Sequence, residues 1–385
     1  MRILFISHTA DRTGAVAVLL NMQQWLARHS DVKIVTLLLR DGPLAPEFRR
    51  LGSVITVQYA TFRDRMAQRW GSAPYSLLRA IRSLRTSQSF DLIYSNTFVN
   101  GQALELLRGR APKVITHVHE LGFVLSLQGQ DICDKVMAGS DHFIACSNAV
   151  KNNLVETQKI SGQKISVMNS FSAPCEEIQA VRRCVVRAEF LAEVGIPETA
   201  LVVGCCSSGH LHKGYDLLTS LAMDVAGEIK GRPVHFLHVG PFDNPHDLLM
   251  AQQDAVKAGV ADRVHYIGYR SNATSWISIF DVHALLSRED SCPLVMLEAA
   301  ALAIPTVCFD TSGGAPEFCS GGYGVIVPYV HIGAMGNAVE RLLEDQVYRT
   351  ELGEAARGKL QSHYDVSVVM PRWMNLVYGL CGQER

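Results

Sequence analysis

Short apolar runs rich in valine and isoleucine alternate with longer helical patterns along the sequence. Such continuous apolar runs are typical of parallel strands buried on both faces, with helices covering those faces. The pattern therefore predicts an α/β fold. The predicted strands are Arg2–Ser7, Val32–Leu39, Val54–Gln58, Leu92–Asn96, Val114–His119, Phe143–Cys146 and Ile165–Met168, then Leu201–Cys206, Val234–Val239, Val264–Ile267, Val282–Leu286, Thr306–Phe309 and Val325–Val327.

The two halves of the chain begin alike, with a strand, a turn of small residues and a helix. Thr13-Gly14-Ala15 stands in the first such turn, and Gly209 to Gly214 forms the second. We therefore expect two Rossmann-like domains facing a central cleft, with a ligand at the carboxyl ends of their strands. The expected domains are 1–172 and 173–365, and the C-terminal helix 366–385 is expected to pack back on the first.

Composition limits where the protein works and what it binds. A net charge of −1 over 385 residues argues against a protein that binds nucleic acid over its whole surface. The most apolar stretch, 294–309, is interrupted by Glu298 and Pro305 and is too short to span a bilayer. The ten cysteines form no Cys-x-x-Cys pair and are expected to be buried reduced thiols. These features predict a soluble cytoplasmic protein.

Charge is unevenly distributed between the halves. Residues 1–172 carry 20 Lys and Arg against 12 Asp and Glu, whereas the remainder carries 16 against 25. The densest basic segment, 63–85, combines six arginines with apolar residues at helical spacing. It indicates either peripheral contact with the inner face of a membrane or an ordinary helix with one solvated face. The sequence leaves both interpretations open.

The richest loop follows the strand predicted to end at Leu286. Asp290 and Glu289 lie in the turn, and Pro293 marks a first helical position. The free amides of that helix's first turn would bind a phosphate, Asp290 would lie beside the group attached to it, and Glu298 could accept hydrogen bonds from a ribose. Alternatively, the acids only stabilise the helix dipole and Glu298 is a solvated helix residue.

This segment resembles the E-x7-E motif of the retaining glycosyltransferases of family 4 (GT4), which have the GT-B fold. Asp290 stands at the first acidic position of that motif and Glu298 at the second. The run from Glu298 to Val307 is similar to the family's Glu-Ala-x-Ala-x-Gly-x-Pro-Val, with Ala303-Ile304 in place of the usual glycine.

Other segments resemble the family in order and spacing, so the resemblance covers nearly the whole chain. It implies that 1–172 binds the acceptor and that 173–365 binds the nucleotide-sugar donor. Segments similar to those of the family are Thr13-Gly14-Ala15, His117-Val118-His119-Glu120, 143–150, the Lys-Gly-x-x-Leu-Leu loop 213–218, Ile267-Gly268-Tyr269-Arg270 and 312–317. The resemblance implies catalytic roles for His119, Lys213, Asp290 and Glu298, and substrate contacts for Thr13, Gly14, Ala15, Gly209, Tyr269, Arg270, Glu289, Ser291, Cys292, Pro293, Leu294 and Val295.

One position departs from the family's pattern. Where the family often has an arginine about five residues before the lysine, this chain has Ser208. His210 and His212 are nearby replacement donors, and Arg270 and Arg288 are further candidates for completing the phosphate clamp. No spacing suggests a third ligand to complete a zinc site with His117 and His119, and neither a P-loop nor a nicotinamide-binding glycine pattern occurs.

The resemblance implies a metal-independent, cofactor-independent retaining glycosyltransferase. It would transfer a sugar from a UDP-sugar, UDP-glucose by default, to a glycan or lipid-linked acceptor in cell-surface or exopolysaccharide synthesis. Two alternatives use the same cleft: a sugar-nucleotide-binding protein without catalysis, and a nucleotide-sugar epimerase or hydrolase.

Overall fold

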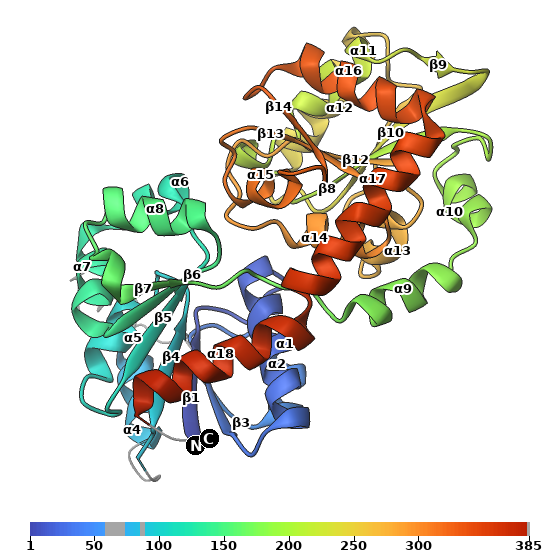
Figure 1. Cartoon of the computed structure of the whole chain (residues 1–385). Coiled ribbons are helices and arrows are strands. Elements are labelled where there is room, and N and C mark those ends of the chain that lie inside the picture. Colours follow the sequence, from blue (N-terminus) through green and yellow to red (C-terminus); the bar gives the residue numbers. More distant parts are fainter. Residues whose placement is uncertain (58–73, 85–88, 383–385) are drawn as a thin grey trace. The chain divides into compact units, whose positions relative to one another are not determined.

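The computed structural model describes residues 1–57, 74–84 and 89–382. The chain forms two compact units, one of Met1–Ser170 with Val366–Arg385 and one of Phe171–Asp365 (Figure 1). The units divide two residues before the boundary predicted from the sequence. Each unit is an α/β structure built on a parallel sheet, so the predicted fold class is confirmed.

The first unit contains a seven-stranded sheet in the order β3-β2-β1-β4-β5-β6-β7, with every pairing parallel. Its central strands are buried along their length because helices cover both faces. The strands are β1 (Arg2–Ser7), β2 (Lys33–Leu38), β3 (Ser53–Thr56), β4 (Leu92–Asn96), β5 (Val114–Val118), β6 (His142–Ala145) and β7 (Ile165–Val167).

The last helix of the chain belongs to this first unit. The Trp373 side chain of α18 is fully buried, and its ring meets that of Tyr94 from β4 at a centroid distance of 5.4 Å. The helices of the unit are α1 (Gly14–His29), α2 (Ala45–Leu51), α4 (Tyr75–Ser83), α5 (Gly101–Leu106), α6 (Gly122–Ser126), α7 (Gln130–Gly139), α8 (Asn148–Glu156) and α18 (Val366–Cys381).

The second unit repeats the design with the order β11-β10-β8-β12-β13-β14. These pairings are all parallel, and the short β9 adds an antiparallel pairing to β10 that the sequence did not predict. The strands are β8 (Leu201–Cys206), β9 (Glu228–Ile229), β10 (Arg232–Val239), β11 (Val264–Tyr266), β12 (Val282–Leu285), β13 (Thr306–Phe309) and β14 (Val325–Val327).

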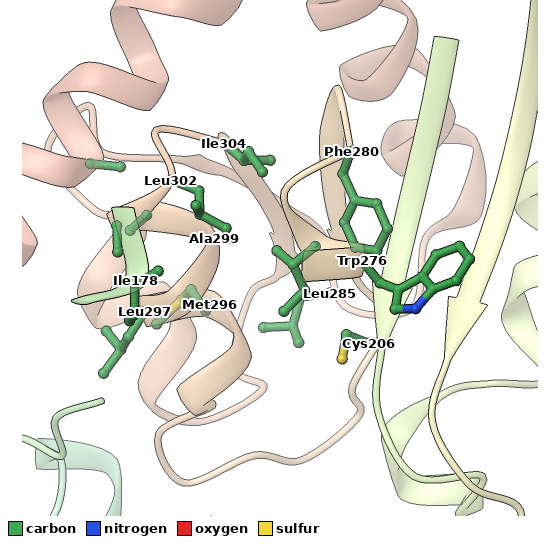
Figure 2. Close-up of a cluster of buried hydrophobic side chains, with 14 of the residues drawn as sticks. Ile178, Cys206, Trp276, Phe280, Leu285, Met296, Leu297, Ala299, Leu302 and Ile304 are labelled. Carbon is green, nitrogen blue, oxygen red and sulfur yellow. The ribbon is translucent and has the colours of Figure 1, made fainter. Parts of the chain in front are cut away.

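Two apolar cores lie on the two faces of this second sheet. Figure 2 shows part of one core, in which Met296 and Leu297 of α14 and Leu285 of β12 are buried. This packing fixes α14 behind the carboxyl end of the sheet. The helices are α9 (Cys175–Arg183), α10 (Arg187–Glu193), α11 (Leu217–Asp224), α12 (Pro245–Lys257), α13 (Ala273–Ile277), α14 (Leu294–Ala301), α15 (Gly314–Cys319), α16 (Ile332–Glu344) and α17 (Gln346–Lys359).

Only residues 74–84 of the basic segment 63–85 are described. In α4, Leu77 and Ile81 are buried while Arg79 and Arg82 are exposed, an arrangement that both interpretations of this segment predict. Arg63, Arg65, Arg69 and Arg85 lie outside the described residues. Across the described ranges, each helix is too short or too polar to cross a bilayer.

Candidate functional site

The carboxyl edge of the second sheet brings together two residues predicted to act on substrate. Lys213 ends a one-turn helix after β8, and Asp290 lies in the loop after β12. The Nζ atom of Lys213 donates to Oδ2 of Asp290 at 2.6 Å, with the two side chains 24% and 12% exposed. This pair places a cation and an anion side by side. An anionic ligand that also carries hydroxyl groups could bind the lysine through its charge and donate hydroxyl hydrogen bonds to the aspartate.

Gly214 allows the lysine loop to approach this close to the loop after β12. Its φ of +75° lies in the left-handed region, which favours glycine. A Cβ atom here would stand 1.9 Å from the carbonyl oxygen of Leu286. The glycine of the Lys-Gly motif is therefore required by backbone conformation and by contact.

Arg288 ties the same two loops together a second time. Its Nη1 and Nη2 atoms donate to the two carboxylate oxygens of Asp216 at 2.8 and 2.7 Å, and Nη1 also donates to the carbonyl oxygen of Leu211 at 2.6 Å. The amide of Arg288 donates to the carbonyl oxygen of His212 at 2.8 Å. Because Lys213 lies between Leu211 and Asp216, this clamp fixes the stretch that carries the lysine.

Glu298 lies one turn inside α14, near the thiol of Cys206 at the end of β8. Burial raises the pKa of its carboxyl group to about 7. The residue is half-buried, and burial rather than a hydrogen bond is the cause of this shift in the pKa. A carboxyl group held at the carboxyl edge of the sheet is suited to accept hydrogen bonds from a ligand.

The start of α14 lies one residue later than predicted. Pro293 precedes the helix with ψ of 113°, and α14 begins at Leu294 without a side-chain cap on its first amides. Around the start of the helix, the half-buried residues are Ser291, Leu294 and Val295, and the buried residues are Cys292 and Pro293. In the first turn of α14 the amide of Met296 donates to the carbonyl oxygen of Pro293 at 3.1 Å, and no side-chain cap occupies the amides before it.

The remaining predicted residues of this unit lie at the same edge of the sheet. Gly209 donates its amide to the carbonyl oxygen of Pro241 at 2.7 Å, which joins the loops after β8 and β10. The amide of Glu289 donates to the carbonyl oxygen of His212 at 3.3 Å. Tyr269, which follows β11, is half-exposed.

Of the candidate replacements for the missing arginine, Arg288 and Arg270 pair with carboxylates, and Nε2 of His210 lies 3.3 Å from Oδ2 of Asp243. Besides the Arg288 clamp, Arg270 donates to Glu193 at 3.3 Å and lies over the ring of Trp276. Burial and the neighbouring Lys213 lower the pKa of His212 to about 4, so its ring is neutral at pH 7. Lys213 is therefore the cation that the described part of this site presents next to Asp290.

The first unit gathers its predicted residues at the carboxyl edge of its own sheet. Thr13 and Gly14 are exposed at the start of α1, Ala15 is half-buried, and His119 directly follows β5. The His119 Nε2 atom lies 2.9 Å from Oδ1 of Asn96, at the end of β4, and Nδ2 of Asn96 donates to the carbonyl oxygen of Ala15 at 2.9 Å.

A metal site at His117 and His119 finds no support in the described ranges. Their ring centroids are 4.0 Å apart, but no cluster of three or more metal-ligating side chains occurs there. Sequence reasoning overlooked Asn96 and the Asp216 partner of Arg288. A polar residue at the end of a buried strand was the available signal for Asn96.

Two Rossmann-like units, the second with a lysine, an aspartate and a half-buried glutamate at the carboxyl edge of its sheet, are characteristic of the GT-B class. Two family models cover most of the chain: Glycosyltransferase Family 4 matches residues 12–170, and Glycosyl transferases group 1 matches residues 186–359. The chain belongs to the GT4 glycosyltransferases, as its motifs predicted.

Curated relatives align at low identity. The chain is 29% identical to the alpha-D-kanosaminyltransferase of Streptomyces kanamyceticus over 47% of this chain and 46% of that protein. It is 25% identical to a D-inositol 3-phosphate glycosyltransferase of Kribbella flavida over 73% and 69% of the two chains. A GDP-mannose-dependent monoacylated alpha-(1-6)-phosphatidylinositol monomannoside mannosyltransferase of Corynebacterium glutamicum is 25% identical over 48% and 49%. The chain thus spans about half to two thirds of the length of these relatives.

Solved structures share the whole fold. The structure of Anabaena Alr3699/HepE in complex with UDP-glucose superposes with a TM-score of 0.81 at 17% identity, over 98% of this chain and 100% of that chain. At this identity the likeness establishes the fold alone.

Proposed function

We propose that this protein transfers a sugar from a nucleotide diphosphate sugar to an acceptor hydroxyl group. One observation carries the proposal: the carboxyl edge of the second sheet holds the Lys213–Asp290 pair at 2.6 Å together with Glu298. A cation, an aspartate and a hydrogen-bond acceptor match the diphosphate, the sugar and the ribose of such a donor. Membership of the GT4 family supports this interpretation.

The proposed mechanism depends on stabilising the leaving group. When the bond from the sugar to the diphosphate breaks, negative charge grows on the diphosphate oxygens. Lys213 and the uncapped amides of α14 supply the positive charge and hydrogen bonds for it, so the reaction would need neither a metal nor a cofactor. Asp290 would orient sugar hydroxyl groups and Glu298 the ribose. Front-face attack assisted by the departing phosphate would retain the anomeric configuration.

The donor we propose is a UDP-sugar, with glucose as the first to test. The Anabaena protein that shares the fold binds UDP-glucose, but the Corynebacterium relative is named for GDP-mannose. GDP-mannose is therefore the main competing donor.

The first unit is the proposed acceptor domain. Its excess of Lys and Arg suits an anionic or lipid-linked acceptor, such as a precursor of a cell-surface or exopolysaccharide. Reaction on such an acceptor would take place in the cytoplasm, with the exposed arginines of α4 next to the inner face of a membrane.

A product analysis tests the proposed transfer. The purified protein is incubated with UDP-glucose or GDP-mannose and a panel of lipid-linked and free glycan acceptors in EDTA, and the anomeric configuration of any product is read by NMR. A new glycoside that wild type makes and Lys213→Ala does not make is the expected result. Donor converted or cleaved without an acceptor would favour the epimerase or hydrolase, and donor binding without turnover would favour the binding protein.

A further inference from the structure

Asn96 forms a buried bridge between two predicted substrate residues of the first unit. It is the last residue of β4, and its side chain is fully buried. Its Nδ2 atom donates to the carbonyl oxygen of Ala15 at 2.9 Å, and its Oδ1 atom lies 2.9 Å from Nε2 of His119. One amide group thus joins the first turn of α1 to the residue that follows β5.

The hydrogen-bond chemistry of this bridge determines the protonation of the His119 ring. A backbone carbonyl oxygen only accepts, so the Asn96 atom facing Ala15 must be the NH2 group. The atom facing His119 is then the amide oxygen, which also only accepts. The His119 Nε2 atom must therefore carry a proton, and in the neutral ring Nδ1 is left as an acceptor.

The surroundings keep this ring neutral and in place. Burial, with repulsion from His8 after β1, lowers the pKa of His119 to about 3. The ring centroids of His117 and His119 are 4.0 Å apart. Oε2 of Glu120 accepts hydrogen bonds from the backbone amides of His119 and Phe98 at 3.0 and 3.1 Å. Among the described residues, His8 after β1, His117 of β5 and Glu120 after β5 are thus titratable groups near His119.

The backbone next to Asn96 is strained and firmly held. Thr97 has φ of +112°, which a β-branched residue rarely adopts, and its amide donates to the carbonyl oxygen of His117 at 2.8 Å. A residue kept in such a conformation is fixed by its neighbours. The position of the Asn96 side chain is therefore well defined by the fold.

We infer that Asn96 is a positioning residue that holds His119 in its Nε2-protonated form and presents Nδ1 as an acceptor to a substrate hydroxyl group. The hydroxyl part of this inference rests on the proposed function, in which His119 contacts the donor sugar or the acceptor. The protonation of the ring does not, because it follows from hydrogen bonds within the first unit. The hydrogen bond of the His119 ring within the described residues is made by Nε2, and the ring is half-buried.

Nitrogen NMR of the histidine rings measures the protonation directly. The full chain is labelled with 15N in its 14 histidines, and His119 is assigned by comparison with His119→Gln. At pH 7 wild type should show a protonated Nε2 and an unprotonated Nδ1 at His119. In Asn96→Ala these two signals should shift toward each other, because the ring loses its acceptor and samples both neutral forms.

A matched variant separates positioning from loss of a buried amide. Gln23→Ala removes a fully buried amide that pairs with Thr36 at 3.0 Å in the same unit. It should destabilise the unit without changing the His119 signals. We expect Asn96→Ala to lower kcat roughly tenfold or more beyond Gln23→Ala, with the KM for donor little changed.

Each outcome bears on one claim. A proton on Nδ1 of wild-type His119, or an Asn96→Ala spectrum identical to that of wild type, would overturn the inference. So would the expected spectral change together with kcat equal to that of Gln23→Ala. If wild type transfers no sugar at all, the proposed function fails, whereas the NMR result still decides whether Asn96 sets the protonation of His119.

Discussion

Gly214 is the residue on which the geometry of the donor loop depends most directly. We expect Gly214→Ala to lower the free energy of unfolding by about 1–2 kcal/mol, because alanine is strained in the left-handed conformation. The clash of its Cβ atom with the Leu286 carbonyl oxygen should lower it by about 1–3 kcal/mol more. The control is Gly195→Ala, at φ +70° with no atom within 4 Å of the added Cβ, which carries only the first cost. Urea unfolding of the two variants measures the difference, and equal losses would contradict the close approach.

Glu298 makes stability depend on pH. Its folded pKa of about 7 lies above the ordinary value of 4.5 because burial disfavours the charged form. The folded protein therefore binds the proton more tightly, and this contribution to stability is present below pH 4.5 and is lost as pH rises toward 7. The free energy of unfolding of Glu298→Gln should rise relative to that of wild type between pH 5 and 8. The control Glu351→Gln changes an exposed residue and should show no such rise. Parallel pH profiles of the Glu298→Gln and wild-type free energies of unfolding would contradict the assignment.

At the scale of elements, the Arg288–Asp216 clamp joins the loops after β8 and β12. We expect Arg288→Ala and Asp216→Ala each to weaken nucleoside diphosphate binding about tenfold, because the loop that carries Lys213 loses its fixed position. The double variant Arg288→Ala with Asp216→Ala should lose less than the sum of the two single losses, with a coupling energy of about 1 kcal/mol or more.

The helical pair of half-buried Arg357 and exposed Glu354 provides the matched control for this clamp. Removing either partner should leave nucleotide binding unchanged, since both residues lie on α17. Isothermal titration measures all these variants. Additive losses at Arg288 and Asp216 would show that the two residues do not act as a clamp.

The sequence predicted the elements better than the contacts between them. All 13 predicted strands are present within a residue or two, because buried parallel strands leave continuous apolar runs. β9 was missed since its two residues, Glu228 and Ile229, carry no such signal. Lys213, Asp290 and Glu298 could be proposed as candidates because they stand in local motifs. The Asn96–His119 and Arg288–Asp216 partners are 23 and 72 positions apart, and only the fold brings them together.

At the scale of the whole molecule, two fully buried tryptophans report on the two units separately. Trp373 of α18 lies in the core of the first unit and Trp276 of α13 in that of the second. Trp373→Ala should destabilise the first unit by about 3–5 kcal/mol, and Trp276→Ala the second by a similar amount. Hydrogen exchange read separately for the two units should show each loss confined to one of them. An equal loss of protection in both units would contradict the assignment of α18.

The central claim is that the carboxyl edge of the second unit binds a nucleoside diphosphate through Lys213. Isothermal titration in EDTA, with UDP, GDP, ADP, CMP and dTDP against wild type and Lys213→Ala, tests it most directly. We predict that one nucleoside diphosphate binds without metal, and that Lys213→Ala weakens its binding about tenfold or more. Equal affinity of wild type and Lys213→Ala for that nucleotide, or no binding of any nucleotide by wild type, would contradict the claim.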